Sequence, residues 1–157
     1  MEIITITGRG IAIRLKIDDS SIIDIDLTPG NEPDTHFPYS SHLTPFIQPF
    51  EEYLSGKPVA FDLPLKLDRL TEFQADVFEQ LKRVSYGQVI SYEELAIQVR
   101  GPDHRRAVAR ALSANPFPIV IPCHRVVPKH FSPDNIGGFS CGTDIKRILL
   151  KLEGVLA

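Results

Sequence analysis

Residues 71–96 read TEFQADVFEQLKRVSYGQVISYEELA, and this stretch predicts two helices separated by a turn. Thr71 and Gln74 have the spacing of a capping box, in which the two residues satisfy each other's backbone N–H groups. Ser91 and Glu94 repeat the same spacing at a second helix start. The first helix carries an apolar stripe formed by Phe73, Val77, Phe78 and Leu81. We therefore expect a helix, a turn and a short second helix.

The chain continues with GPDHRRAVARALSANP at residues 101–116, which predicts a third helix. Asp103 is a candidate N-cap, and the Asn115–Pro116 pair ends the helix, because a residue before proline disfavours helical backbone. The packed stripe of this helix consists of Ala107, Val108, Ala111 and Leu112. Two short capped helices of this kind, the second rich in arginine, resemble a helix-turn-helix.

Basic side chains gather around this third helix, in a chain whose net charge is −3. They are Arg100, His104, Arg105, Arg106 and Arg110. A net acidic chain differs from the strongly basic domains that coat nucleic acid, but it can still carry a local basic face. From the residues alone two interpretations stay open: a solvated helix face, or a helix that contacts phosphates.

The first third of the chain predicts a small antiparallel sheet. Residues 11–17 alternate Ile or Leu with Ala, Arg and Lys, and residues 22–27 alternate apolar residues with aspartates. Proline, glycine and acidic residues mark a loop from Thr28 to Tyr39. A helix should follow from about Pro45 to Leu54, with Gly56 as its stop.

The character of the sequence changes near Asp68, where sheet-like alternation gives way to capped helices. We therefore expect two domains, residues 1–69 and 70–157, in a mixed α/β (α+β) fold. The chain has 157 residues and is 43% hydrophobic, which is enough to bury a core without disulfide or metal staples. Its N-terminus does not resemble a signal peptide, and no apolar run approaches the roughly 18 to 20 residues that cross a bilayer. We expect a soluble, cytoplasmic protein, or a nuclear one if the source is eukaryotic.

One of the two cysteines lies in IPCHRVV, residues 121–127, at the end of an apolar run. If this segment is extended, the side chains of Cys123 and His124 point to opposite sides, and a proton passing between them needs a carrier. Two cysteines are more typical of free thiols than of a secreted disulfide framework. No His/Cys cluster has the spacing of a metal site, so we predict no metal.

The last predicted helix lies in TDIKRILLKLEG, residues 143–154. Its apolar residues at helical spacing are Ile145, Ile148, Leu149 and Leu152. Glu153 lies at the C-terminal end, where a carboxylate opposes the helix dipole. Two interpretations stay open: an exposed glutamate without a role, or a carboxylate held there for a functional reason.

Four stretches occur in order between Phe61 and Gly154: FQADVFEQLKRVSYGQVISYEELA, RRAVARALSANPFPIVIPCHRVV, GGFSCG and KRILLKLEG. Together they resemble the motifs of the O6-alkylguanine-DNA alkyltransferases, also called methylated-DNA–protein-cysteine methyltransferases. This family moves an alkyl group from O6 of guanine in DNA onto its own cysteine, in one irreversible step without a cofactor. The resemblance implies a ribonuclease H-like N-terminal sheet with a helix, and a winged helix-turn-helix-like C-terminal domain that carries the cysteine.

The resemblance implies catalytic roles for three residues. Cys123 would be the nucleophile, His124 the base that draws its proton through a water, and Glu153 the carboxylate that orients the imidazole. A base is needed because a free cysteine, with a pKa of about 8.5, is mostly protonated at neutral pH. Arg125 belongs to the same motif, and we interpret it as structural.

The resemblance also implies that the partner is double-stranded DNA containing O6-alkylguanine, bound through its minor groove by a monomer without membrane association. O4-alkylthymine is left open as a second lesion. Arg106 would enter the stack where the nucleotide has flipped out, and Arg105 would contact DNA beside it. Ala107 and Ala109 would allow the helix to approach the groove closely.

Other residues are assigned by the resemblance to the base pocket and its support. Tyr92 would promote flipping and donate a hydrogen bond to guanine, while Asn115 would hold the turn before the active-site segment. The carbonyls of Cys123 and Val126 and the loop that contains Ser140 would recognise guanine, with Pro118 as an apolar wall.

The loop PKHFSPDNIGGFSCGTD, residues 128–144, departs from the family pattern. It is longer, and it carries Phe139 where a tyrosine and Cys141 where a glycine are common. Cys141 is either a small filler or a group at the pocket rim, where it would narrow the pocket or form a disulfide with Cys123 under oxidation.

Three alternative functions remain. A cysteine hydrolase would also use Cys and His, but it would need an oxyanion site and would turn over repeatedly. A non-catalytic lesion-binding relative typically has tryptophan in place of the cysteine, which Cys123 argues against. A helix-turn-helix transcriptional regulator is the third alternative.

Overall fold

The computed structural model describes residues 1–31 and 41–157 and divides the chain into two compact units, Met1–Lys66 and Leu67–Ala157. The division lies close to the boundary expected between residues 69 and 70. The loop predicted from Thr28 to Tyr39 lies outside the described residues from position 32 onward. In the part of the chain that is described, no helix is long and apolar enough to cross a membrane.

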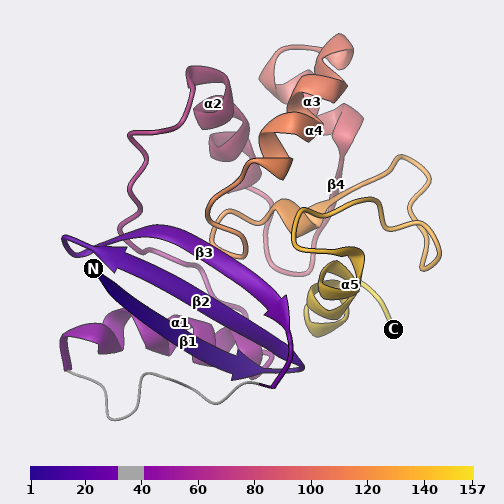
Figure 1. The fold of residues 1–157 in the computed structure, drawn as a ribbon. Helices are drawn as coiled ribbons and strands as arrows, with labels where there is room; N and C mark the ends of the chain where they lie inside the picture. Colours follow the sequence, from indigo (N-terminus) through magenta and orange to yellow (C-terminus); the bar gives the residue numbers. More distant parts are fainter. Residues whose placement is uncertain (32–40) are drawn as a thin grey trace. The chain divides into compact units, whose positions relative to one another are not determined.

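The first unit contains the predicted antiparallel sheet, with strands β1 (Glu2–Gly8), β2 (Ile11–Asp18) and β3 (Ser21–Pro29) paired in that order (Figure 1). Both hairpins turn over two residues. In the second, Asp19 and Ser20 have φ of 49° and 62°, which matches the right-handed twist of the strands that they join. The prediction of an antiparallel sheet from the alternating residues 11–17 and 22–27 is confirmed.

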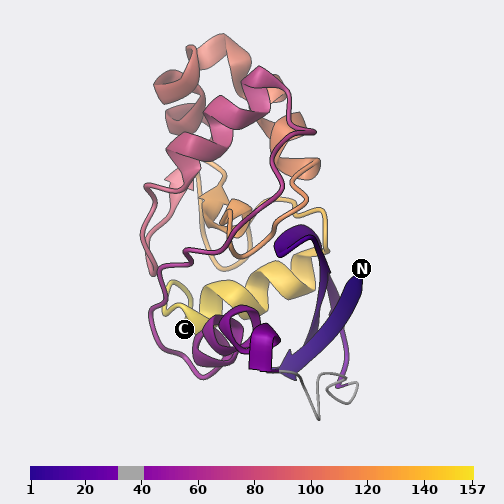
Figure 2. The same ribbon diagram turned by 90° about the vertical axis from the view of Figure 1, so that its left-hand side faces the viewer.

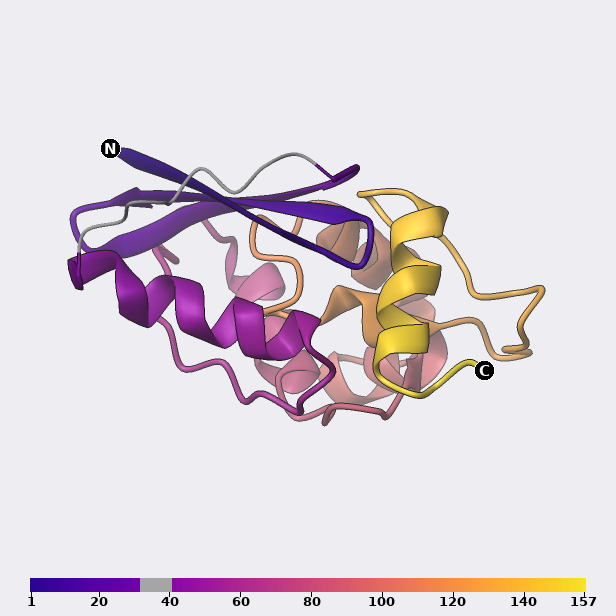
Figure 3. The same cartoon turned by 90° about the horizontal axis from the view of Figure 1, so that it is seen from below.

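Helix α1 (Thr44–Leu54), preceded by a 3₁₀ turn (Ser41–Leu43), runs along one face of this sheet (Figure 3). Gly56 follows the helix with φ +93° and donates its N–H to the Tyr53 carbonyl, so the predicted glycine stop is confirmed. The core of the unit is formed by large side chains with almost no exposure: Ile4, Ile6, Ile11, Ile13, Leu15, Ile47, Phe50 and Tyr53.

The second unit groups three helices that pack on one another: α2 (Glu72–Leu81), α3 (Tyr92–Val99) and α4 (Arg105–Ser113) (Figure 2). Both predicted capping boxes are confirmed, with Thr71 accepting from the Gln74 backbone N–H and Ser91 from that of Glu94. The expected order of helix, turn, short helix, turn and helix is therefore correct.

The start of the third helix was predicted wrongly at Asp103. A 3₁₀ turn, Pro102–His104, precedes α4, and His104 occupies the N-cap position without a side-chain hydrogen bond. Gly101, with φ +136°, and Pro102 commit the chain to this tighter turn, so Asp103 lies inside it rather than at the cap.

A two-residue parallel pair, β4 (Ile90–Ser91) with β5 (Val126–Val127), joins the helical group to the segment that contains Cys123. The last helix, α5 (Thr143–Leu152), ends with Glu153 at its C-cap. Its buried face includes Ile145 and Leu149, as predicted, and also Lys146 and Leu150.

Candidate active site

Cys123 begins a 3₁₀ turn, Cys123–Arg125, that follows Pro122 and leads directly into β5. The extended conformation considered for this segment is therefore wrong. Successive side chains on a 3₁₀ helix are about 120° apart, so Cys123 and His124 still point in different directions. His124 is fully buried, whereas Cys123 keeps 5% exposure.

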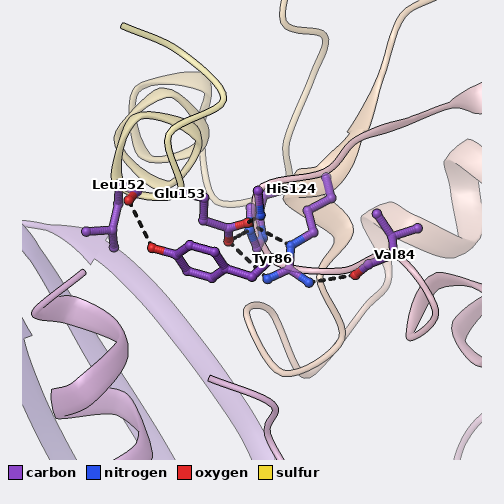
Figure 4. A network of polar contacts seen from close by, with 7 residues as sticks. Val84, Tyr86, His124, Leu152 and Glu153 are labelled. Carbon is purple, nitrogen blue, oxygen red and sulfur yellow. Dashed lines mark hydrogen bonds and ion pairs between the residues drawn. The ribbon is translucent and has the colours of Figure 1, made fainter. Parts of the chain in front are cut away.

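The buried imidazole of His124 faces the carboxylate of Glu153, with 2.5 Å between Nε2 and Oε2 (Figure 4). Arg125 binds the same carboxylate, through Nε to Oε1 at 2.8 Å and Nη2 to Oε2 at 3.2 Å. The Gly87 backbone N–H also donates to Oε1, at 3.2 Å. Glu153 is thus a fully buried acceptor with several donors, which removes the interpretation of an exposed glutamate without contacts.

Arg125 also anchors the turn between α2 and β4. Its Nη1 donates to the Val84 carbonyl at 2.7 Å, while the Tyr86 hydroxyl donates to the Leu152 carbonyl at 3.0 Å (Figure 4). These bonds, with those to Glu153, tie the Cys123–Arg125 turn and the turn between α2 and β4 to the end of α5. They agree with the structural role expected for Arg125.

The pKa values of this network fix where the protons lie. Burial by itself would raise the pKa of Glu153, but its hydrogen bonds and charge interactions with His124 and Arg125 together lower it to about 2. Burial lowers the pKa of His124 despite the opposing effect of Glu153. At neutral pH the carboxylate is therefore ionised and the imidazole neutral.

A carboxylate only accepts hydrogen bonds, so Nε2 of His124 must carry the hydrogen that points at Glu153. In a neutral imidazole the other nitrogen, Nδ1, then carries the lone pair. This tautomer leaves His124 able to take up a proton on the side away from Glu153, as a general base requires.

The low pKa of Glu153 predicts loss of stability in acid. Because the folded-state pKa of about 2 is below the ordinary value of 4.5, the contribution is present above about pH 5 and is lost as the pH falls toward 2. Its full size is on the order of 3 kcal/mol in the free energy of unfolding. Urea titrations of wild type and Glu153→Gln should show a stability difference that shrinks across this pH range. A difference that does not depend on pH would contradict the assignment.

Cys123 needs a base, because burial raises the pKa of its thiol to about 12. A side-chain hydrogen bond from Asn115 opposes this shift. The Asn115 amide also donates to the Ile121 carbonyl at 2.9 Å, and its oxygen accepts the Phe117 N–H at 2.9 Å. Asn115 thus braces both ends of the segment that joins α4 to Cys123.

Within this braced segment, Ile119 has φ +74°, a left-handed conformation that is costly for a β-branched residue. The Ile121 N–H closes the turn by donating to the Phe117 carbonyl at 2.8 Å. The Asn115 side chain and the burial of Ile119 hold the strained turn that delivers Cys123 to its position.

A pocket of about 310 Å³ opens beside the thiol. Its lining residues are Tyr92, Ala109, Leu112, Ser113, Cys123, Gly138, Phe139 and Ser140. Four of the predicted site residues, Tyr92, Ala109, Cys123 and Ser140, therefore meet at one cavity, although they come from four different segments. Burial, reinforced by the Cys123 charge, raises the pKa of Tyr92, so its hydroxyl remains a hydrogen-bond donor.

Other predicted pocket residues lie behind this surface. Pro118 and Val126 are buried and do not line the pocket, and the Val126 carbonyl accepts a hydrogen bond from Lys146. Sequence reasoning did not assign Leu112, Ser113 or Phe139 to the pocket lining.

The predicted DNA-contacting residues lie on α4. Arg105 and Arg106 are exposed, Ala107 is half-buried, and Ala109 is exposed on the pocket side. Arg106 and Ala109 are three residues apart, so they share a face of the helix. Arg106 is thus an exposed arginine one helical turn from Ala109, which lines the pocket beside Cys123.

Cys141 is half-buried, and its charge adds to the effect of burial in raising the pKa of Cys123. Its suggested roles in pocket width and in a disulfide stay predictions. Among residues 1–31 and 41–157, no cluster of three or more His, Cys, Asp or Glu side chains could hold a metal ion.

Residues 72–155 match the family described as 6-O-methylguanine DNA methyltransferase, DNA binding domain. This match spans more than half of the chain, and the chain belongs to this family.

Relatives of known name agree with this assignment. A methylated-DNA–protein-cysteine methyltransferase of Saccharolobus islandicus is 36% identical over 141 residues, covering 88% of this chain and 85% of the relative. The crystal structure of Mycobacterium tuberculosis OGT in complex with DNA is similar with a TM-score of 0.77 and 29% identity, over 99% of this chain and 94% of that one. The O6-methylguanine-DNA methyltransferase of Pyrococcus kodakaraensis gives a TM-score of 0.72 and 27% identity, over 98% and 97%. The expected family and mixed α/β fold are confirmed.

Proposed function

We propose that this protein repairs DNA by transferring an alkyl group from O6 of guanine to its own Cys123, once per molecule and irreversibly. The observation that carries this proposal is the position of Cys123. Its thiol lines a small pocket and is preceded in sequence by the Asn115 turn and followed by the buried His124–Glu153 pair. This position brings together a nucleophile, a base and a binding cavity.

The reaction follows from the protonation states. His124 takes the thiol proton through a water, and the imidazolium that forms is stabilised by the ionised Glu153. The thiolate attacks the alkyl carbon in line, a C–S bond forms, and the C–O bond breaks with its electron pair left on O6 of guanine. A hydrogen bond from the Tyr92 hydroxyl, which lines the same pocket, stabilises the departing anion.

Because Cys123 is buried, a guanine within a duplex must leave the base stack to reach it. In this proposal a monomer binds double-stranded DNA through the minor groove with α4, and Arg106 occupies the space of the extruded nucleotide. Arg105 contacts the backbone, while Ala107 and Ala109 permit close approach. Ser140 takes part in guanine recognition at the pocket surface, with Pro118 and the Val126 carbonyl behind that surface. O4-alkylthymine is a further substrate to be tested.

We assign these tasks to residues 70–157 as a DNA-binding and alkyl-transfer domain, with residues 1–69 as a separate α/β domain. All residues of the proposed mechanism fall within the Leu67–Ala157 unit. The reaction would take place where cellular DNA lies, in the cytoplasm, or in the nucleus of a eukaryote.

Mass spectrometry of the intact protein tests the proposal directly. After incubation with a duplex containing O6-methylguanine, the protein should gain one methyl mass, located on the Cys123 peptide. The Cys141 peptide serves as an internal control, and Cys123→Ala and an undamaged duplex should give no gain. No mass change in a folded sample would refute alkyl transfer, whereas repeated turnover of an ester or peptide substrate would favour a hydrolase.

A further inference from the structure

The end of α5 forms a Schellman motif, a hydrogen-bond pattern in which a glycine with positive φ terminates a helix. Gly154 has φ +77°, and its N–H donates to the Lys151 carbonyl at 3.0 Å. The Val155 N–H reaches back to the Leu150 carbonyl at 2.9 Å. Glu153 is the C-cap residue of this motif. The motif therefore fixes the backbone from which the Glu153 carboxylate projects.

A Schellman motif is often accompanied by an apolar contact between the residue after the glycine and the last turn of the helix. Here Val155 and Leu150 make up this pair, and they belong to a small apolar cluster, which we call the C-cap cluster. Its members are Val89, Phe131, Ile136, Leu150, Val155 and Leu156. Phe131 and Ile136 come from the loop after β5, the loop whose length departs from the family pattern.

This loop is an ordered turn held against α5. Ser132 and Asn135 each donate a backbone N–H to the carbonyl of the other, at 3.2 and 2.9 Å. Arg147 of α5 donates from Nη1 to the Pro133 carbonyl at 2.6 Å. Ile136 is 4% exposed, so its side chain is buried in the C-cap cluster. The additional length of the loop thus brings apolar side chains to the end of α5.

The Glu153 carboxylate depends on the position of this helix end. Its Oε2 lies 2.5 Å from Nε2 of His124, and a displacement of about 1 Å would take the pair out of hydrogen-bond range. The Gly87 N–H donates to Oε1 at 3.2 Å, and Val89 of the C-cap cluster follows two residues later. The cluster therefore joins the two segments that hold the carboxylate, the end of α5 and the turn before β4.

We propose that Phe131 and Ile136 are positioning residues for alkyl transfer, which hold the C-cap of α5 so that Glu153 stays in contact with His124. This inference rests on the proposed transfer to Cys123. The sequence did not indicate this role, because both residues are distant from Glu153 along the chain and the loop carries no helix or strand pattern.

Phe131→Ala tests the inference, because Phe131 is half-buried at the edge of the C-cap cluster. We expect methyl transfer from an O6-methylguanine duplex to slow by about tenfold, since a misplacement of about 1 Å in a catalytic group costs up to about 100-fold. Binding of undamaged duplex should stay close to wild type. Phe131→Leu, which keeps the apolar contact, should recover most of the lost rate.

The pH dependence of transfer from free O6-benzylguanine separates positioning from a general loss of stability. Glu153 opposes the effect of burial on the His124 pKa, whereas Arg125 and Lys146 add to that effect. A weaker Glu153 contact therefore lowers the His124 pKa further. The fall of the rate in acid, where His124 becomes protonated, should then move to lower pH in Phe131→Ala. A variant that is merely less stable would unfold in acid, which moves this fall to higher pH.

Asp134→Ala is the matched control, because Asp134 is exposed on the same loop and lies outside the C-cap cluster. Ile136→Val is a smaller change in the cluster, and it should move the fall in the same direction if Phe131→Ala folds poorly. A wild-type rate and pH profile in folded Phe131→Ala, or in Ile136→Val where Phe131→Ala does not fold, would overturn the inference. So would a fall that moves to higher pH. Failure of wild type itself to gain a methyl group would instead refute the proposed function.

Discussion

Glu153→Gln slows methyl transfer to Cys123 by about 100-fold or more in our expectation, while affinity for duplex DNA stays close to wild type. An amide in place of the carboxylate cannot stabilise an imidazolium. It can also donate to Nε2 of His124, which would move the imidazole hydrogen to Nδ1 and block uptake of the thiol proton. Single-turnover rates on an O6-methylguanine duplex, with binding to undamaged duplex measured in parallel, give the answer.

Arg125→Met separates chemistry from folding in this experiment. Glu153 also neutralises the buried Arg125, so its replacement should destabilise the fold by several kcal/mol as well. Arg125→Met breaks the same ion pair but leaves Glu153 facing His124. It should lower the free energy of unfolding with a smaller effect on the transfer rate. If Glu153→Gln weakens DNA binding and leaves the chemistry intact, the relay assignment is wrong.

Arg106→Ala should slow the repair of duplex DNA by about 100-fold, yet leave the reaction with free O6-benzylguanine nearly unchanged. Only the duplex reaction requires a base to be unstacked, which costs a few kcal/mol and which an inserted side chain offsets. Arg106 is exposed on the face of α4 that also presents Ala109 to the pocket. The ratio of the two rates measures extrusion separately from alkyl transfer.

Arg105→Ala is the matched control for Arg106→Ala, since Arg105 is exposed on the same helix, one residue earlier. If Arg105 contacts a phosphate, Arg105→Ala should weaken the binding of damaged and undamaged duplexes equally. It should also reduce the slope of log affinity against log salt concentration by about one. If Arg106→Ala lowered the reaction rates with the duplex and with the free base equally, Arg106 would have no role in base flipping.

Local rules predicted much of this fold from the sequence, because the signals were short in range. The capping boxes at Thr71 and Ser91 depend on residues three positions apart. The alternation in the strands depends on residues two positions apart. The resemblance then connected Cys123, His124 and Glu153, and the structure brings His124 and Glu153 into contact.

Other features depend on contacts between distant segments, which local patterns do not carry. Asp103 looked like a cap, but the Gly101–Pro102 pair selects a tighter turn first. The partners of Lys146 are carbonyls of residues 126 and 138, and a sequence pattern of side chains says nothing about where carbonyls converge. Phe139 lines the pocket because of the path of its loop, which the sequence pattern does not indicate.

The near-complete burial of Cys123 bears on how long an unused molecule lasts. A protein whose thiol reacts only once must keep that thiol intact until it meets a damaged base. Peroxides and soluble electrophiles attack exposed thiolates, and oxidation beyond the first steps is irreversible. The Cys123 thiol is almost fully buried and, with a raised pKa, stays protonated at rest, so it reacts slowly with both. The burial that makes the thiol hard to ionise thus also protects the unreacted protein from oxidation and alkylation.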